Sequence, residues 1–516
     1  MKNLFLFITL LLVTSLLYGQ EKVDTLIIKK IKNEELQNSQ IKELAFWLTD
    51  VCGPRLTNSP GYRKAVDWTV QTFRQWGLKN AGPEPWGEYG KGWSNEETYI
   101  ALRIPFFKSL IGYPFPWCKS TPGLLSANVI LLDSFDSIGI DKLGAQVSGK
   151  IVMRRSPDTT IISPLDGNTL RFNDSLLNKL PDQAMITTKD YNIGKNIFNG
   201  RYSTKRYLES KGAVALLTGA WGRDGTVYVD GYLTYSKSYE STLPQLHLSS
   251  EDFLLIQRLL TNNQTVKLDM KLENKLYTDN ITGYNVVAEI PGTDPVLKDQ
   301  VVMLGAHLDS WHTGTGATDD AAGCVATMEA IRILKSLGVK PRRTIRIALW
   351  GAEEQGLLGS FGYVKAHFGD PRDMKLKPEQ QKITAYFNLD NGTGKIRGIF
   401  LQNNENVRDI FTSWLKPFAS SGAIGVNSNS TGGTDHLSFD AVGIPAFQFI
   451  QDPIEYEERT HHTNMDVYDH LYLEDLKQAA TIIAAFVYNA AMRDEMLPRK
   501  PLPKPEPFIF ENGFVK

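Results

Sequence analysis

Cysteine and histidine are both scarce in this chain. Its 516 residues include only 3 Cys and 8 His. Three cysteines, Cys52, Cys118 and Cys324, can form at most one disulfide, which excludes a small disulfide-stabilised scaffold. No CxxC pair occurs, so nothing indicates a sulfur-ligated metal site. Seven of the histidines lie between His307 and His470, and this clustering directs attention to the second half of the chain.

The chain also lacks an excess of charge of either sign. Its 56 Lys and Arg residues balance 57 Asp and Glu residues, which leaves a formal net charge of -1, and 10% of the residues are aromatic. A nucleic-acid-binding protein normally has a basic excess, and a disordered chain has fewer aromatic residues. The composition therefore predicts a large globular protein with no nucleic-acid partner.

Only one long apolar run is present. It covers residues 4–17, follows Lys2 and ends in Tyr18-Gly19-Gln20. This pattern predicts a signal peptide over residues 1–19 and a secreted or periplasmic protein, with an uncleaved anchor as the alternative. The run is shorter than the ~20 residues of a membrane-spanning helix, and no other stretch qualifies, so no membrane span is expected.

The remaining sequence changes character along its length. Helical spacing at 41–48 and 62–76 is followed by short strand-like runs from 119 to 277. From residue 285 onward, apolar strands (301–304, 344–350, 383–389) alternate with amphipathic helices (321–337, 357–368, 474–492). This alternation predicts an α/β fold with a mixed, mainly parallel sheet flanked by helices. The expected boundaries are 20–118 for the N-terminal part of this domain, 119–277 for a β-rich insert, 278–495 for the main domain and 496–516 for a Pro-rich tail.

Acidic residues and histidines follow the predicted strands directly. These residues are His307 and Asp309 after the first strand, Glu353 and Glu354 after the second, and Asp390 after the third. Reactive groups gather at the carboxyl ends of strands in open α/β sheets. Any one such acid could be an ordinary solvated loop residue, but several together would repel one another unless a divalent cation neutralised them. Nitrogen and oxygen ligands without thiolate suit zinc.

Together with a Gly-rich segment and a late histidine pair, these motifs resemble the co-catalytic zinc exopeptidases of peptidase family M28. Within that family they resemble the carboxypeptidase Q-like (plasma glutamate carboxypeptidase-like) branch. The resemblance covers nearly the whole mature chain, and its anchors are residues 305–311, 317–323 and 349–356, Asp390, His461-His462 with Asp466, and the entry segments 52–56 and 59–61. It implies the zinc exopeptidase (phosphorylase/hydrolase-like) fold with a protease-associated insert at 119–277.

The resemblance also implies two Zn2+ ions per chain. His307 and Asp390 would hold one ion, and Glu354 and His462 would hold the other, with Asp319 as the bridge. Asp319 is preferred over Asp320 because it follows His307 by twelve residues, the spacing of this branch. His462 is preferred over His461 because an acid, Asp466, follows it by four residues, as in the family pattern.

Further roles follow from the same resemblance. Glu353 would be the general base, and Asp309, two residues along from His307, would orient the ring of that histidine. Asp435 or His436 would contact substrate, because the segment around them is similar to a family stretch that lines the cleft.

The implied activity is that of a secreted dizinc exopeptidase, an aminopeptidase or dipeptidase that hydrolyses dipeptides or short peptides with a free N-terminus. Two alternatives are a single-zinc glutaminyl cyclase-like acyltransferase and a non-catalytic binding homologue. Candidates at all five ligand positions argue against both. A peptide substrate is the expected partner, and a homodimer stays open.

Overall fold

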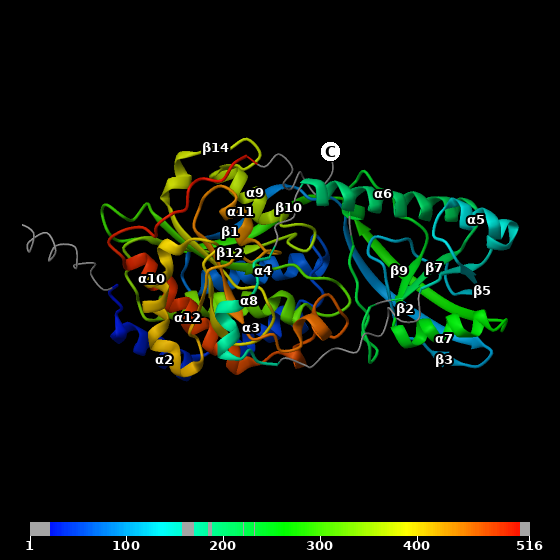
Figure 1. Ribbon diagram of the computed structural model, residues 1–516, viewed down its shortest axis with the longest axis horizontal. Coiled ribbons are helices and arrows are strands. Elements are labelled where there is room, and N and C mark those ends of the chain that lie inside the picture. The colour runs from blue at the N-terminus through cyan, green and yellow to red at the C-terminus, as the bar shows by residue number, and fades with distance from the viewer. Residues whose placement is uncertain (1–20, 157–169, 184–187, 220, 232, 506–516) are drawn as a thin grey trace, which may run out of the picture.

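The computed structural model describes residues 21–156, 170–183, 188–219, 221–231 and 233–505 (Figure 1). The predicted signal peptide, residues 1–19, and the end of the predicted Pro-rich tail lie outside the described residues. None of the helices in the described part of the chain combines the length and the apolar character that a membrane crossing needs.

The first of two large sheets has eight strands, in the order β1-β10-β12-β11-β15-β18-β16-β17. The four central strands are parallel, whereas β10 runs antiparallel to β12 and β16 runs antiparallel to β18. The predicted mixed α/β fold is therefore confirmed. The strands are β1 (Lys79–Glu88), β10 (Thr282–Ile290), β11 (Val301–His307), β12 (Thr344–Trp350), β15 (Ile383–Asn388), β16 (Ile396–Phe400), β17 (Gly425–Asn427) and β18 (Ala446–Gln451).

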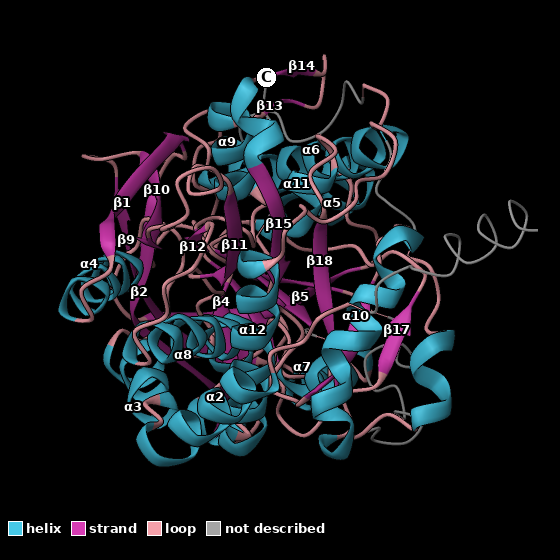
Figure 2. Cartoon of the chain, turned by 90° about the vertical axis from the view of Figure 1, so that its left-hand side faces the viewer, coloured by secondary structure: helices cyan, strands magenta, loops and turns pink. Residues whose placement is uncertain are grey.

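Helices cover both faces of this sheet because successive strand residues point to opposite sides (Figure 2). In β11, Val302 and Leu304 belong to one buried cluster, while Val301 and Met303 belong to another. The first cluster includes residues of α2 (Thr25–Asn38), α3 (Ile41–Phe46), α4 (Pro60–Gln75), α8 (Ala322–Ser336), α10 (Arg408–Leu415) and α12 (Leu473–Met492). The second includes residues of α9 (Leu358–His367) and α11 (His436–Asp440).

The second sheet also has eight strands, in the order β3-β2-β9-β5-β6-β7-β8-β4, and forms a separate unit at the right of Figure 1. It contains β2 (Gly92–Ile104), β3 (Lys108–Ser109), β4 (Gly112–Pro114), β5 (Leu125–Leu132), β6 (Ile151–Arg154), β7 (Ala215–Gly219), β8 (Gln245–Leu248) and β9 (Lys267–Tyr277). Its helices are α5 (Ser137–Leu143), α6 (Thr188–Ser210) and α7 (Ser250–Thr261), and a small hairpin elsewhere joins β13 (Gly369–Asp370) to β14 (Lys375–Leu376).

The second unit starts earlier in the chain than the sequence boundary at residue 119. The long strand β2 pairs with β9 along nearly its whole length, from Gly92 opposite Tyr277 to Ile104 opposite Lys267. The strands β2, β3 and β4 all precede residue 119, and all belong to the second sheet. In the sequence, the second unit is therefore inserted between β1 and β10 of the first sheet.

Candidate metal centre

His307 is the last residue of β11, and both nitrogens of its imidazole face acceptors. Nδ1 lies 3.0 Å from the backbone oxygen of Asp309, and Nε2 lies 3.1 Å from Asp319 Oδ1 and 3.6 Å from Asp390 Oδ1. A carbonyl can only accept, so Nδ1 carries the proton and Nε2 faces the two carboxylates. Burial would lower the pKa of His307, but the carboxylates, led by Asp390 and Glu353, raise it well above its usual range. The carboxylates around His307 therefore favour a positive charge at this place.

Asp319 lies between the two halves of the site, in the short turn Ala317–Ala321 that precedes α8. Its Oδ1 faces His307, while its Oδ2 lies 3.4 Å from His462 Nε2 and 3.9 Å from His461 Nε2. Oδ2 is buried and has no hydrogen-bond partner among the described residues. A buried carboxylate oxygen without a donor is costly unless a cation binds it.

The neighbouring Asp320 has a different environment. Its carboxylate accepts hydrogen bonds from the backbone N–H groups of His307 (3.3 Å) and Gly323 (2.8 Å). These bonds hold the turn against the end of β11. Asp320 is thus engaged with the backbone, whereas Asp319 reaches both histidine groups.

Glu354 and His462 form the other half of the site. His462 Nε2 lies 2.9 Å from Glu354 Oε2, and Glu354 Oε1 accepts a hydrogen bond from the backbone N–H of Trp311 at 3.2 Å. Burial raises the pKa of Glu354 well above its usual range, and Asp319 adds to this effect. The ring of His461 packs on that of His462, with 3.9 Å between centroids, but no equally short contact joins His461 to a carboxylate of the site.

The arrangement fits divalent cations. Three sets of side chains place one ligand atom each within 4.8 Å of one another: His307, Asp319 and Glu354; His307, Asp320 and Asp390; and Asp319, His461 and His462. All five ligands predicted from the sequence belong to these sets. Oxygen and nitrogen donors without thiolate are the combination that zinc accepts in hydrolytic sites.

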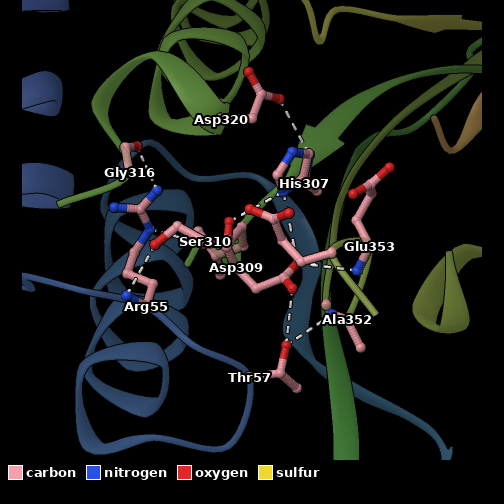
Figure 3. Close-up of polar contacts among 12 residues, drawn as sticks. Arg55, Thr57, His307, Asp309, Ser310, Gly316, Asp320, Ala352 and Glu353 are labelled. Atoms are coloured by element: carbon pink, nitrogen blue, oxygen red, sulfur yellow. Dashed lines mark hydrogen bonds and ion pairs between the residues drawn. The ribbon is translucent and has the colours of Figure 1, made fainter. Parts of the chain in front are cut away.

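Asp309 joins the ends of β11 and β12 beneath the site (Figure 3). Its Oδ1 accepts a hydrogen bond from the Glu353 N–H at 3.1 Å, and its Oδ2 accepts one from the Thr57 hydroxyl at 3.0 Å. Thr57 Oγ1 in turn accepts from the Ala352 N–H at 2.9 Å. Asp309 therefore positions the Glu353 backbone as well as lying beside His307.

The Glu353 carboxylate extends toward the side on which His307 lies, away from Asp309 (Figure 3). Burial raises its pKa well above the usual range, although the charge of His307 opposes this shift. The two adjacent glutamates thus have separate surroundings, since Glu354 contacts His462 and Trp311.

Arg55 supports the loops of the site from below. Its guanidinium is completely buried and donates to four backbone oxygens, those of Leu48, Leu308, Thr315 and Gly316, at 2.6–3.0 Å. Arg55 and Thr57 both lie in the segment that follows Cys52. The motif at 52–56 pointed to this segment, but not to the hydrogen bonds that these two side chains make.

The two predicted substrate contacts lie at the start of one short helix. Asp435 and His436, at the start of α11, are both fully buried, so neither presents a side chain on an open surface. Burial raises the pKa of Asp435 to about 8. His436 Nε2 lies 3.1 Å from the backbone oxygen of Thr431.

One contributor to the site comes from the second unit. The Tyr228 hydroxyl lies 3.3 Å from His462 Nδ1, and the Val229 N–H donates to the backbone oxygen of His462 at 2.9 Å. Nothing in the local sequence around Tyr228 distinguishes it from other aromatic residues. Only the folded chain brings it to the metal-binding histidine candidate.

Comparisons with known proteins find similar peptidases. The family model "Peptidase family M28" matches residues 285–487. Carboxypeptidase Q of Mus musculus is 27% identical over 93% of this chain and 91% of its own length. The aminopeptidase YwaD of Bacillus subtilis is 30% identical over 49% of this chain and 52% of its own length.

A solved structure extends the likeness to three dimensions. The peptidase M28 precursor of Shewanella amazonensis is 26% identical, covers 92% of this chain and 98% of its own, and superposes with a TM-score of 0.66. The matched family segment contains β11, β12 and β15, whose ends carry the acidic residues and His307 described above. On its sequence, its fold and this matched segment, the chain contains a peptidase family M28 domain.

Proposed function

We propose that this chain is a dizinc exopeptidase that hydrolyses dipeptides or short peptides with a free N-terminus. The observation that carries the proposal is the position of Asp319, whose two carboxylate oxygens face His307 on one side and His462 on the other. A bridging carboxylate of this kind is what two metal ions ~3.5–4 Å apart require.

The five proposed ligands divide between two ions. His307 and Asp390 would hold one, Glu354 and His462 the other, and Asp319 both. The short His462–Glu354 contact of 2.9 Å supports His462 over His461. When bound, zinc would supply Lewis acidity and lower the pKa of a water molecule.

The protein's own groups would then direct the reaction. Glu353 takes the proton of the attacking water and delivers it to the amine that leaves, as a general base and then a general acid. Its backbone is fixed by Asp309, which is held by Thr57. Burial raises the pKa of the Glu353 carboxyl, and a carboxyl with a raised pKa is a stronger base toward the water than an ordinary glutamate.

The names of the relatives support an exopeptidase, since one is a carboxypeptidase and another an aminopeptidase. These names differ in the chain end that they specify, so the substrate class is part of the proposal. We also infer export, from the apolar run at residues 4–17, and a protease-associated character for the second unit.

Metal content and peptide hydrolysis, measured on the same preparation, test this function. The purified full chain should bind two zinc ions and release free amino acids from a panel of dipeptides, with activity lost on chelation and restored by zinc. A protein with one zinc that converts N-terminal glutamine to pyroglutamate would instead be a cyclase, and the proposal would be abandoned.

A further inference from the structure

Two segments that carry proposed metal ligands lie together in the fold but far apart in the sequence. The turn Ala317–Ala321 carries Asp319, and the loop that follows residue 460 carries His462. Asp319 Oδ2 and His462 Nε2 lie 3.4 Å apart. Neither residue belongs to a strand, so the sheet alone does not fix this distance.

Asp466 joins the two segments through Thr318, the residue before Asp319. Its Oδ1 accepts hydrogen bonds from the backbone N–H of Thr318 at 2.5 Å and from the hydroxyl of Thr318 at 2.8 Å. Thr318 Oγ1 also lies 2.8 Å from Thr460 Oγ1. Because the Thr318 hydroxyl has one hydrogen and donates it to Asp466, the Thr460 hydroxyl donates to Thr318. All three side chains are buried, and together they form one hydrogen-bonded cluster.

The Gly-rich segment before the turn packs against the same loop. The Thr315 N–H donates to the backbone oxygen of Asp466 at 2.8 Å. A Cβ at Gly314 would lie 2.5 Å from that oxygen and 2.8 Å from the backbone oxygen of Thr463. Any side chain at Gly314 would therefore force the two segments apart, and the glycine permits their close approach.

The loop holds His462 in an uncommon backbone conformation. Its φ is +58°, in the left-handed region that residues other than glycine seldom adopt. Such a conformation persists only where the surrounding contacts determine it. Thr460 lies two residues before His462 and Asp466 four residues after it, and both side chains bond Thr318. The Val229 N–H adds a third contact, to the backbone oxygen of His462 at 2.9 Å.

We propose that Asp466 is a positioning residue, which holds His462 against Asp319 and so fixes the metal position formed by Glu354 and His462. Asp466 belongs to none of the candidate ligand sets found among the described residues, and it acts through Thr318. The inference rests on the proposed dizinc function. It adds to that function the contact that brings the bridging carboxylate and the late histidine together.

The position of the other ion should depend less on Asp466. Asp320 independently bonds the turn to the end of β11, through the backbone N–H groups of His307 and Gly323. Asp319 Oδ1 therefore stays near His307 Nε2, now 3.1 Å away, when the loop moves. Loss of the Asp466 contacts should separate the two positions in their zinc affinity.

Zinc affinity of the metal-depleted full chain, measured at both positions by competition with a chelator, tests the inference. Asp466→Ala removes the acceptor of both Thr318 bonds, and Asp466→Asn keeps an oxygen in its place. Gly314→Ala leaves the three side chains intact and displaces the loop instead. Asp252→Ala is the matched control, because Asp252 is also buried and accepts the Ile111 backbone N–H at 2.7 Å within the second unit.

Asp466→Ala and Gly314→Ala should weaken zinc binding at the His462 position by about 10- to 100-fold and leave the other position close to the wild type. Asp466→Asn should bind zinc as the wild type does, because its amide oxygen can accept the same two bonds. Asp252→Ala should keep both affinities even where urea unfolding of the metal-free protein shows it to be as destabilised as Asp466→Ala. This comparison separates positioning from a general loss of stability.

Unchanged zinc affinity in Asp466→Ala and Gly314→Ala would overturn the proposal. Equal weakening in Asp466→Asn and Asp466→Ala would assign the effect to the charge of Asp466 and contradict positioning through Thr318. Weakening of the same size in Asp252→Ala would show that the loss of any buried acid has this effect, and would also overturn it. If Asp466→Ala does not fold, Gly314→Ala decides. A wild-type protein that binds fewer than two zinc ions would contradict the proposed function itself.

Discussion

The hydroxyl of Tyr228, in the second unit, lies 3.3 Å from Nδ1 of His462, in the M28 domain. If Nε2 of His462 is the ligand atom, Nδ1 carries a proton and donates it to this hydroxyl. Such a partner fixes the ring orientation of a metal-binding histidine. The second unit therefore contributes a side chain to the candidate metal centre.

Tyr228→Phe should weaken zinc binding at the His462 position by about tenfold and leave the other position unchanged. The measurement is competition with a chelator on the metal-depleted protein, which resolves the two affinities. Tyr239→Phe is the control, because that hydroxyl bonds Asn199 at 2.8 Å, among residues of the second unit. Unchanged affinity at both positions in Tyr228→Phe would show that the contact has no role in holding the metal.

The adjacent histidines should differ sharply in their effect on metal content. His462→Ala should bind one zinc per chain, because it loses the group that contacts both Glu354 and Asp319. His461→Ala should keep close to two, since its nearest contact to Asp319 is 3.9 Å. Elemental analysis of both variants checks this, and the reverse pattern would transfer the ligand role to His461.

Arg55 should be important for stability although it contacts no proposed ligand. Arg55→Met leaves four backbone oxygens without their donor in a fully buried place, which should lower the free energy of unfolding by about 3–5 kcal/mol. Urea unfolding measures the change. Arg74→Met, which removes an exposed arginine bonded to the Ala81 oxygen, should cost less than about 1 kcal/mol. Equal effects would contradict a special role for Arg55.

Glu35 should make the protein less stable as the pH rises. Its side chain is buried, and this burial together with the neighbouring Glu329 of α8 raises the pKa of Glu35 to about 8. Glu329 accepts two hydrogen bonds from the Arg332 guanidinium, at 2.7 and 2.8 Å. The folded chain therefore keeps a proton on Glu35 that the unfolded chain releases near pH 4.5.

Because the folded state binds the extra proton, this contribution to stability is present below about pH 4.5 and is lost progressively up to about pH 8. Glu35→Gln should remove this loss and be more stable than the wild type by on the order of 2 kcal/mol near pH 8, with little difference near pH 4.5. Unfolding curves at several pH values measure the difference, and a difference that does not grow with pH would show that Glu35 is ionised in the folded protein.

The periodic elements of the M28 domain could be predicted closely from the sequence. The strand expected at 344–350 is β12, and the helix expected at 474–492 begins one residue earlier, at Leu473. These segments have a regular apolar pattern because they are buried against neighbours on a sheet face. The same packing determines which residues are buried and at what spacing apolar residues recur, so the spacing in the sequence predicts the element.

Elements without a regular apolar pattern could not be predicted from the sequence. Helix α2 buries only Ile28, Ile31 and Glu35, so an acid interrupts its apolar face. Strand β1 lies at the edge of its sheet and contains Pro83 and Pro85, which an edge strand tolerates but which obscure any alternation.

The same distinction applies to the site. Its candidate ligands follow strands of one domain and could be recognised in order along the sequence. Thr57 and Tyr228 reach the site from 252 residues before Asp309 and 234 residues before His462. No local pattern encodes such contacts, because they depend on how the second unit and the entry segment pack against the M28 domain.

The central claim is that two zinc ions and Glu353 together hydrolyse a peptide bond, and Glu353→Gln tests it most directly. Zinc content and dipeptide turnover should be measured on the same sample of this variant. The account predicts two zinc ions per chain, as in the wild type, with kcat lower by about 10²–10⁴-fold. Turnover at the wild-type rate with both metals bound would contradict it.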